Sequence, residues 1–113
     1  SSTAVLAQEL GEFCWKQENT ECTLKLNATQ HNDFFSFIGN KICPSGELSH
    51  VSGSGFISDN QINIGLKFIS ESTFPTEIPE TQNINTSLLF DKINLSDLSF
   101  SSDLTYVPAI CDP

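Results

Sequence analysis

The sequence has no methionine, few basic residues and no long apolar run, and each absence narrows what the chain can be. Without an initiator methionine, we expect a processed product from which a signal peptide was removed. Five basic residues stand against 14 acidic ones, and the net charge of −9 disfavours binding to nucleic acid or to an anionic membrane surface. Membrane insertion is not expected, because no apolar run approaches the roughly 20 residues that span a bilayer.

The four cysteines lack the Cys-x-x-Cys spacing typical of zinc sites, and only two histidines accompany them. This pattern favours two disulfide bonds formed in an oxidising compartment, so we expect a secreted or periplasmic protein. The 113 residues are enough for one domain, 1–113, with a core of its own.

Helical periodicity is absent from the body of the chain. One short helix or turn is expected within Ser1–Leu10, where good helix formers follow a Ser/Thr cluster and Gly11 could end the segment. Alternation with the period of two that indicates strands begins at Gly11.

The clearest strand signal is Val51–Phe68, in which two alternating runs flank Asp59-Asn60, a pair suited to a two-residue hairpin turn. This turn fixes the register and places the apolar residues on one face. The inward pairs predicted are Ile57 with Ile62, Gly55 with Ile64, Gly53 with Leu66 and Val51 with Phe68. Phe56 and Ile69 would point outward.

Two earlier strands are expected on either side of a turn at Gln17–Thr20. With Lys16 opposite Glu21, Trp15 would face Cys22 and Phe13 would face Leu24, so that the large apolar residues share a face. After a turn at Gln30–Asp33, a third strand, Phe34–Cys43, has several apolar residues competing for burial. We expect Phe35 and Phe37 to be buried, and Pro44-Ser45-Gly46 to turn the chain into the hairpin.

The segment 71–85 contains Pro75 and Pro79 and is polar and acidic, so it is expected to be a long loop, with Phe74 and Ile78 as anchors. Strand character returns at Thr86–Ile93. Leu98, Phe100, Leu104 and Tyr106 fit one last strand, with a bend or bulge at Ser101-Ser102.

The pattern therefore predicts an all-β domain, an antiparallel up-and-down meander of seven to eight strands that closes into a small barrel. A two-sheet sandwich is the alternative. The opening Gly11-Glu12-Phe13-Cys14-Trp15, after a helix or turn, resembles small calycin-type barrels such as lipocalins, fatty-acid-binding proteins and avidins. Lipocalins place tryptophan two residues after the glycine, where this chain has Phe13 and has its tryptophan at Trp15. The resemblance implies a ligand cavity in the barrel mouth.

The predicted strands also pair the cysteines. Cys22 and Cys43 would lie at the open ends of neighbouring strands, and Cys14 would point to the opposite face from Cys22. Closing the barrel brings the first and last strands together, so we expect Cys14 to bond to Cys111 and Cys22 to Cys43.

No catalytic constellation emerges, and neither an enzyme nor a cofactor is expected. His31 and Asp33 share a turn but lack a third metal ligand. His50 begins an outward row of serines, which would indicate nucleophilic catalysis only with an orienting carboxylate and an oxyanion hole, so we expect ordinary exposed polar residues of a strand. The three glycosylation sequons begin at Asn27, Asn85 and Asn94, in a chain so rich in Ser and Thr that they carry little weight.

Two functions remain for an exported, non-catalytic binding protein. In the first, inward glycines leave room for a small apolar ligand beside aromatic side chains. Its lining would comprise Trp15, Gly53, Gly55, Ile64, Leu66, Phe68 and Tyr106. In the second, a solid core supports a protein-interaction or adhesion module that acts through surface loops or through the outward Phe56 and Ile69. The interior discriminates between them, because a void of several hundred Å3 favours the ligand.

Overall fold

The computed structural model describes residues 7–59, 61–71, 80–87, 100–101 and 105–111. They form eight strands and one antiparallel sheet in the order β6-β5-β4-β3-β2-β1-β8-β7. The strands are β1 (Gln8–Gln17), β2 (Thr23–His31), β3 (Phe34–Ile42), β4 (Leu48–Ser58), β5 (Gln61–Ser70), β6 (Glu80–Ser87), β7 (Phe100–Ser101) and β8 (Thr105–Ala109). The predicted all-β meander is confirmed.

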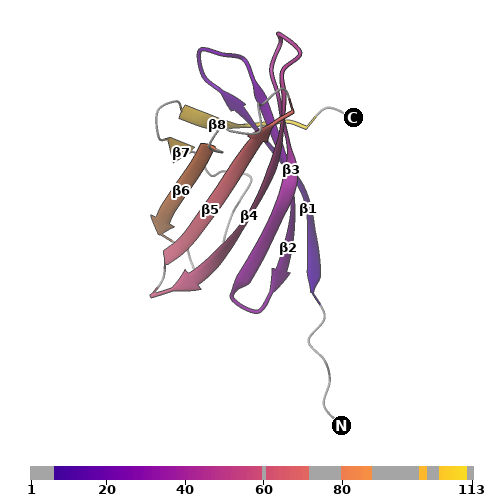
Figure 1. The fold of residues 1–113 in the computed structure, drawn as a ribbon. Helices are drawn as coiled ribbons and strands as arrows, with labels where there is room; N and C mark the ends of the chain where they lie inside the picture. Colours follow the sequence, from indigo (N-terminus) through magenta and orange to yellow (C-terminus); the bar gives the residue numbers. More distant parts are fainter. Residues whose placement is uncertain (1–6, 60, 72–79, 88–99, 102–104, 112–113) are drawn as a thin grey trace.

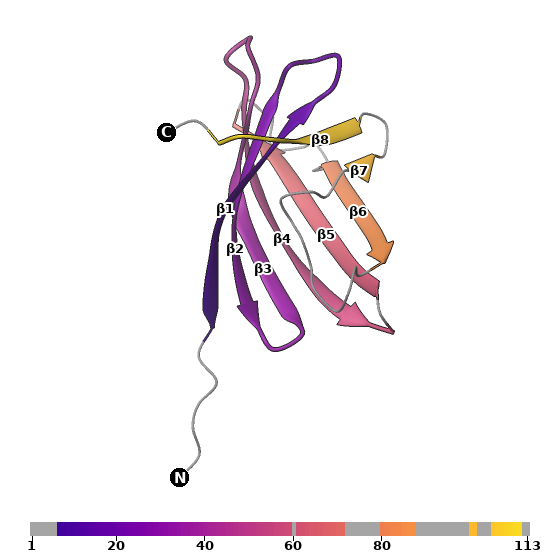
Figure 2. The same cartoon turned by 180° about the vertical axis from the view of Figure 1, so that it is seen from behind.

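The sheet curls into a half-barrel, as Figure 1 shows, and β8 crosses one end of it beside β1. Seen from behind, the same hairpin of β7 and β8 lies across that end (Figure 2). The half-barrel is compatible with both the barrel and the sandwich that the sequence left open. Each strand from β1 to β6 pairs with the next one, and so do β7 and β8, whereas β6 and β7 lie at opposite edges of the sheet. Every pairing is antiparallel.

The central hairpin has the predicted register throughout. Ser58 pairs with Gln61, Gly55 with Ile64 and Val51 with Phe68, and Asp59 has the positive φ of 53° that a two-residue turn requires. The turn between β2 and β3 is equally short, with Asn32 at φ 55°. Both turns leave the strands no freedom to slip.

The first hairpin has a different register from the predicted one. Lys16 pairs with Thr23 and Trp15 with Leu24, two residues beyond the expected partners. Gln17 belongs to β1, and its backbone N–H donates to the carbonyl of Cys22, which moves the turn one residue along the chain. Because the slip is even, the inward and outward faces stay as predicted.

The expected N-terminal helix is wrong where the structure describes it. Gln8–Leu10 begin β1, because their backbone pairs with β2, and this pairing overrides helix propensity. Residues 1–6 lie outside the described part. Gly11 ends no helix, but sits at a shift of register between Glu9 and Gly11, with φ 97°.

Two C-terminal predictions are also corrected. The loop expected over 71–85 is a strand from Glu80 onwards, since β6 pairs with β5 along its length. The predicted single last strand is a hairpin in which Phe100 pairs with Tyr106. Cross-strand partners share a face, so the alternation continued through the reversal and concealed it. Phe74, Ile78, residues 88–93 and Leu98 lie outside the described residues.

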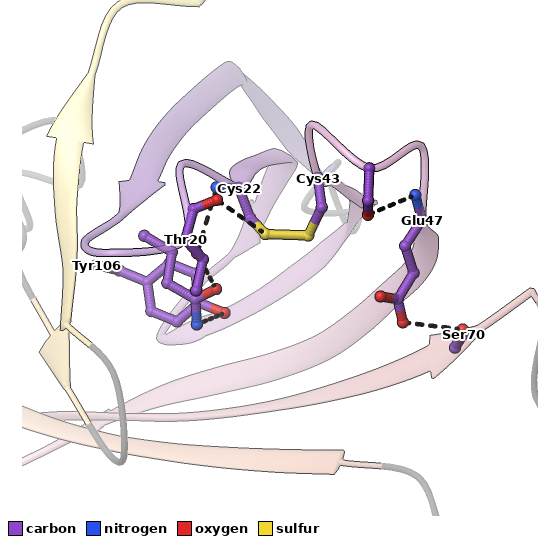
Figure 3. Close-up of a disulfide and its surroundings, with 8 residues drawn as sticks. Thr20, Cys22, Cys43, Glu47, Ser70 and Tyr106 are labelled. Carbon is purple, nitrogen blue, oxygen red and sulfur yellow. Dashed lines mark hydrogen bonds between the residues drawn. A yellow bond between two sulfur atoms is a disulfide. The ribbon is translucent and has the colours of Figure 1, made fainter.

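Both predicted disulfides are present, Cys14–Cys111 and Cys22–Cys43. The first ties the segment after β8 to β1, which pairs with β8 from Cys14 to Gln17. The second closes the ends of β2 and β3, as Figure 3 shows. Two disulfides are compatible with an extracellular or periplasmic location.

Candidate functional site

The interior of the half-barrel holds the residues predicted to line a ligand cavity. Trp15, Ile64, Leu66, Phe68 and Tyr106 are all at most 5% exposed and belong to one hydrophobic cluster. Phe35 and Phe37, predicted to be buried, belong to the same cluster. The structure therefore brings the predicted side chains together, and Lys41 places its ammonium group near the rings of Phe68 and Tyr106.

The two inward glycines are enclosed by their neighbours. A Cβ added to Gly53 would overlap the backbone carbonyl oxygen of Gly65, and one added to Gly55 would lie 3.0 Å from Ile64 Cγ1 and 3.4 Å from Phe37 Cε2. Close approach of strand backbone and side chains thus fills the space that the missing side chains leave. These glycines tighten the coil of the sheet.

A polar cluster that the sequence analysis did not identify lies at the β8 end of the interior. Gln17, taken for a turn residue, is 3% exposed. Its Nε2 donates to the hydroxyl of Tyr106 at 3.1 Å, and its Oε1 accepts from Thr20 at 2.8 Å. Figure 3 shows Tyr106 and Thr20 beside the Cys22–Cys43 bond. These bonds satisfy the buried side-chain amide of Gln17 at the start of the β1–β2 turn.

Lys41 reaches the same region from β3. Its Nζ lies 5.6 Å from the centre of the Phe68 ring and 5.7 Å from that of Tyr106, within the range of cation–π attraction. These two rings lie 6.4 Å apart and come from β5 and β8, so the lysine joins strands that are distant in the sequence. The arrangement helps to hold β8 across the end of the half-barrel.

The opposite, outer face of the sheet carries large apolar side chains exposed to solvent. We call four of them the outer stripe: Phe34, Ile38 and Ile42 on β3, and Phe56 on β4, which are 63, 67, 55 and 46% exposed. Phe34 and Phe56 are cross-strand partners whose rings lie 6.3 Å apart. Because alternate residues of a strand share a face, the three β3 side chains lie along a line roughly 27 Å long, with Ser36 and Asn40 between them.

Electrostatics set this outer face apart from the rest of the molecule. Strands β2, β3, β4 and β5 contain none of the 14 acidic residues of the chain. The acids nearest to them stand at strand ends or on β1: Glu12 pairs with Lys25 at 3.3 Å, and Glu71 pairs with His50 at 3.1 Å. On a chain of net charge −9, the outer surface of β2 to β5 is therefore a part that another acidic molecule can approach with weaker repulsion.

A hollow of about 520 Å3 opens on the outer side, at the Ile42 end of the outer stripe. Its lining comprises Cys14, Glu21, Thr23, Lys25, Asn40, Ile42, Cys43 and Pro44. The two charged groups in it already have partners, since Glu21 pairs with Lys16 at 2.7 Å and Lys25 pairs with Glu12. The hollow is therefore electrically balanced and can accept an apolar group.

The histidines lie at the surface. His50 is exposed and bonded to Glu71, and His31 and Asp33 flank the exposed turn between β2 and β3. Within the described ranges, no three His, Cys, Asp or Glu side chains are grouped so that they could hold a metal ion. The same residues include no helix long and apolar enough to cross a membrane.

Comparison with protein-family models, with curated proteins and with solved structures gives no match.

Proposed function

We propose that the protein is an exported, non-catalytic interaction module that binds a protein partner through the outer stripe. The observation that carries this proposal is the combination of large exposed apolar side chains with a complete lack of acidic residues on the strands that bear them. Large apolar side chains gathered on one exposed face mark interaction sites more often than single scattered ones do. Depletion of charge with enrichment of aromatic groups is typical of the centre of protein interfaces.

The packing around Gly53 and Gly55 favours this function over an apolar ligand held inside. Both positions were expected to leave volume, and neighbouring atoms occupy that volume. Export is supported by the two disulfide bonds, which persist in oxidising compartments.

Photo-crosslinking tests the proposed surface. A benzophenone amino acid replaces Phe56, within the outer stripe, or Ile110, which is 94% exposed and lies after β8. We expect protein adducts from position 56 and none from the control position 110 in cells that produce the protein. Equal labelling from the two positions, or no adduct from position 56, would contradict the proposal.

Native mass spectrometry of protein purified without refolding tests the competing function. The proposed module should carry no small molecule. A bound apolar compound that is released on unfolding would overturn the proposal in favour of an interior ligand site.

A further inference from the structure

The outer stripe has two different ends, and their shapes are complementary. At one end the Phe34 ring is 63% exposed beside Phe56. At the other end Ile42 lines the hollow of about 520 Å3. Ile38 lies midway along β3, four residues from Phe34 and four from Ile42. The exposed Phe34 ring and the hollow beside Ile42 are therefore equally distant from Ile38, in opposite directions along the strand.

We infer that the partner is a second copy of this chain, bound face to face about a two-fold axis that crosses β3 over Ile38. In such an arrangement the two β3 strands run antiparallel, and each Phe34 enters the hollow beside Ile42 of the other copy. A two-fold interface requires this self-complementarity: if Phe34 of one copy contacts Ile42 of the other, then Ile42 of the first copy contacts Phe34 of the second. The inference rests on the proposed function and names the partner.

Charge favours this face for self-association. Two chains of net charge −9 repel each other over most surfaces, and strands β2 to β5 contain no carboxylate. The cross-strand neighbours of Ile38 are Asn27 on β2 and Ser52 on β4, both exposed and uncharged. The centre of the proposed interface is therefore neutral, and at its end the carboxylate of Glu21 is already paired with Lys16.

The size of the face sets the strength of the dimer. The outer surface of β2 to β5, roughly 27 Å long on four strands spaced about 4.8 Å apart, covers roughly 500 Å2 on each copy. The total of about 1,000 Å2 is near the lower limit of specific interfaces, so we expect a reversible dimer with a micromolar dissociation constant.

Placing a charge at the axis gives a decisive test, because a residue on a two-fold axis meets its own copy. Ile38→Lys and Ile38→Glu each place like charges opposite one another, and each should weaken association by more than about tenfold. An equimolar mixture of the two variants pairs Lys with Glu and should restore the dimer. Ile110→Lys is the matched control, since it adds the same charge at an exposed isoleucine away from the sheet and should associate like the parent chain.

Sedimentation velocity over a wide micromolar range measures these effects, and circular dichroism confirms that each variant is folded. A parent chain that keeps its 12.4 kDa monomer mass at all concentrations would overturn the inference. Dimers of the single variants as strong as the parent's, or a mixture that fails to associate, would do the same. A native protein that stays monomeric because a glycan on Asn27 covers Ile38 would also overturn the inference.

These outcomes separate the inference from the proposed function. A position-56 adduct with a different protein, together with a monomeric parent chain, would contradict the second copy and leave the interaction module standing. Absence of any adduct from position 56 would contradict the interaction module itself.

Discussion

Glycine at position 53 lets two strands approach more closely than any side chain would allow. A Cβ there would overlap the Gly65 carbonyl oxygen on β5, whereas at Gly55 the nearest atom is Ile64 Cγ1, on a side chain that can move. We expect Gly53→Ala to cost about 2 kcal/mol or more in the free energy of unfolding and Gly55→Ala to cost less than about 1 kcal/mol. Urea denaturation of both variants measures the difference, and equal costs would contradict the proposed close approach.

A second residue-scale prediction concerns the pair Lys16 and Glu21. The hydrogen bond to Glu21 at 2.7 Å, and then the attraction of its carboxylate, raise the pKa of Lys16. A raised pKa in the folded state means that the pair stabilises the fold fully below the ordinary lysine value of about 10.4 and loses this contribution as the pH rises through the folded pKa.

NMR titration of the Lys16 side chain tests this prediction. Glu21→Gln should lower the pKa of Lys16 and leave stability at neutral pH nearly unchanged, because both side chains are well exposed. Glu71→Gln, which removes a carboxylate paired with His50, is the control and should leave the Lys16 titration as it was. An unchanged titration in Glu21→Gln would rule out the assigned cause.

At the scale of elements, the disulfides fasten different parts of the sheet. Cys14–Cys111 spans 97 residues and holds β8 to β1, whereas Cys22–Cys43 spans 21 residues and joins adjacent strands. In the loop-entropy model, replacing the first pair by serine should cost about 4 to 5 kcal/mol and replacing the second about 3 kcal/mol.

Guanidinium unfolding of the two double-serine variants provides the measurement. Hydrogen exchange adds a local readout, because only the variant without Cys14–Cys111 should lose protection at the β8 amides that pair with Cys14 to Gln17. Loss of β8 protection in the Cys22–Cys43 variant alone would contradict these roles.

The accuracy of the sequence-based predictions depends on how tightly each turn constrains its strands. The two-residue turn after Ser58 fixes the register of the central hairpin, and this register is confirmed pair by pair. The longer turn after Gln17 allowed a slip, because a buried hydrogen bond to Tyr106 keeps Gln17 in the strand. No local pattern carries that information, since the partner lies 89 residues away.

The candidate site was only partly predictable. Outward Phe56 and Ile69 follow from the hairpin register and are exposed as expected, at 46 and 42%. Four apolar residues within β3 compete for burial, and the predicted burial of Phe35 and Phe37 is confirmed. By alternation this leaves Phe34 and Ile38 outward. The hollow beside Ile42 forms from β1, β2, β3 and the turns at their ends, so it required the folded sheet.

At the scale of the whole molecule, the fold separates charge from apolar surface. Among the described residues, the acidic ones stand in turns, at strand ends and on β1, while β2 to β5 carry none and expose the outer stripe. Net negative charge would keep the protein dispersed except where this line can meet another surface.

Hydroxyl-radical footprinting tests most directly whether the protein acts through the outer stripe. Backbone amides of β3 already bond to both neighbouring strands, so side-chain oxidation is a better readout than amide exchange. With rising protein concentration, oxidation of Phe34, Ile38 and Phe56 should fall, whereas Ile110 should keep its rate and the buried Phe35 should stay unreactive. Unchanged oxidation of the outer stripe at every concentration, or protection at Ile110 instead, would contradict the account.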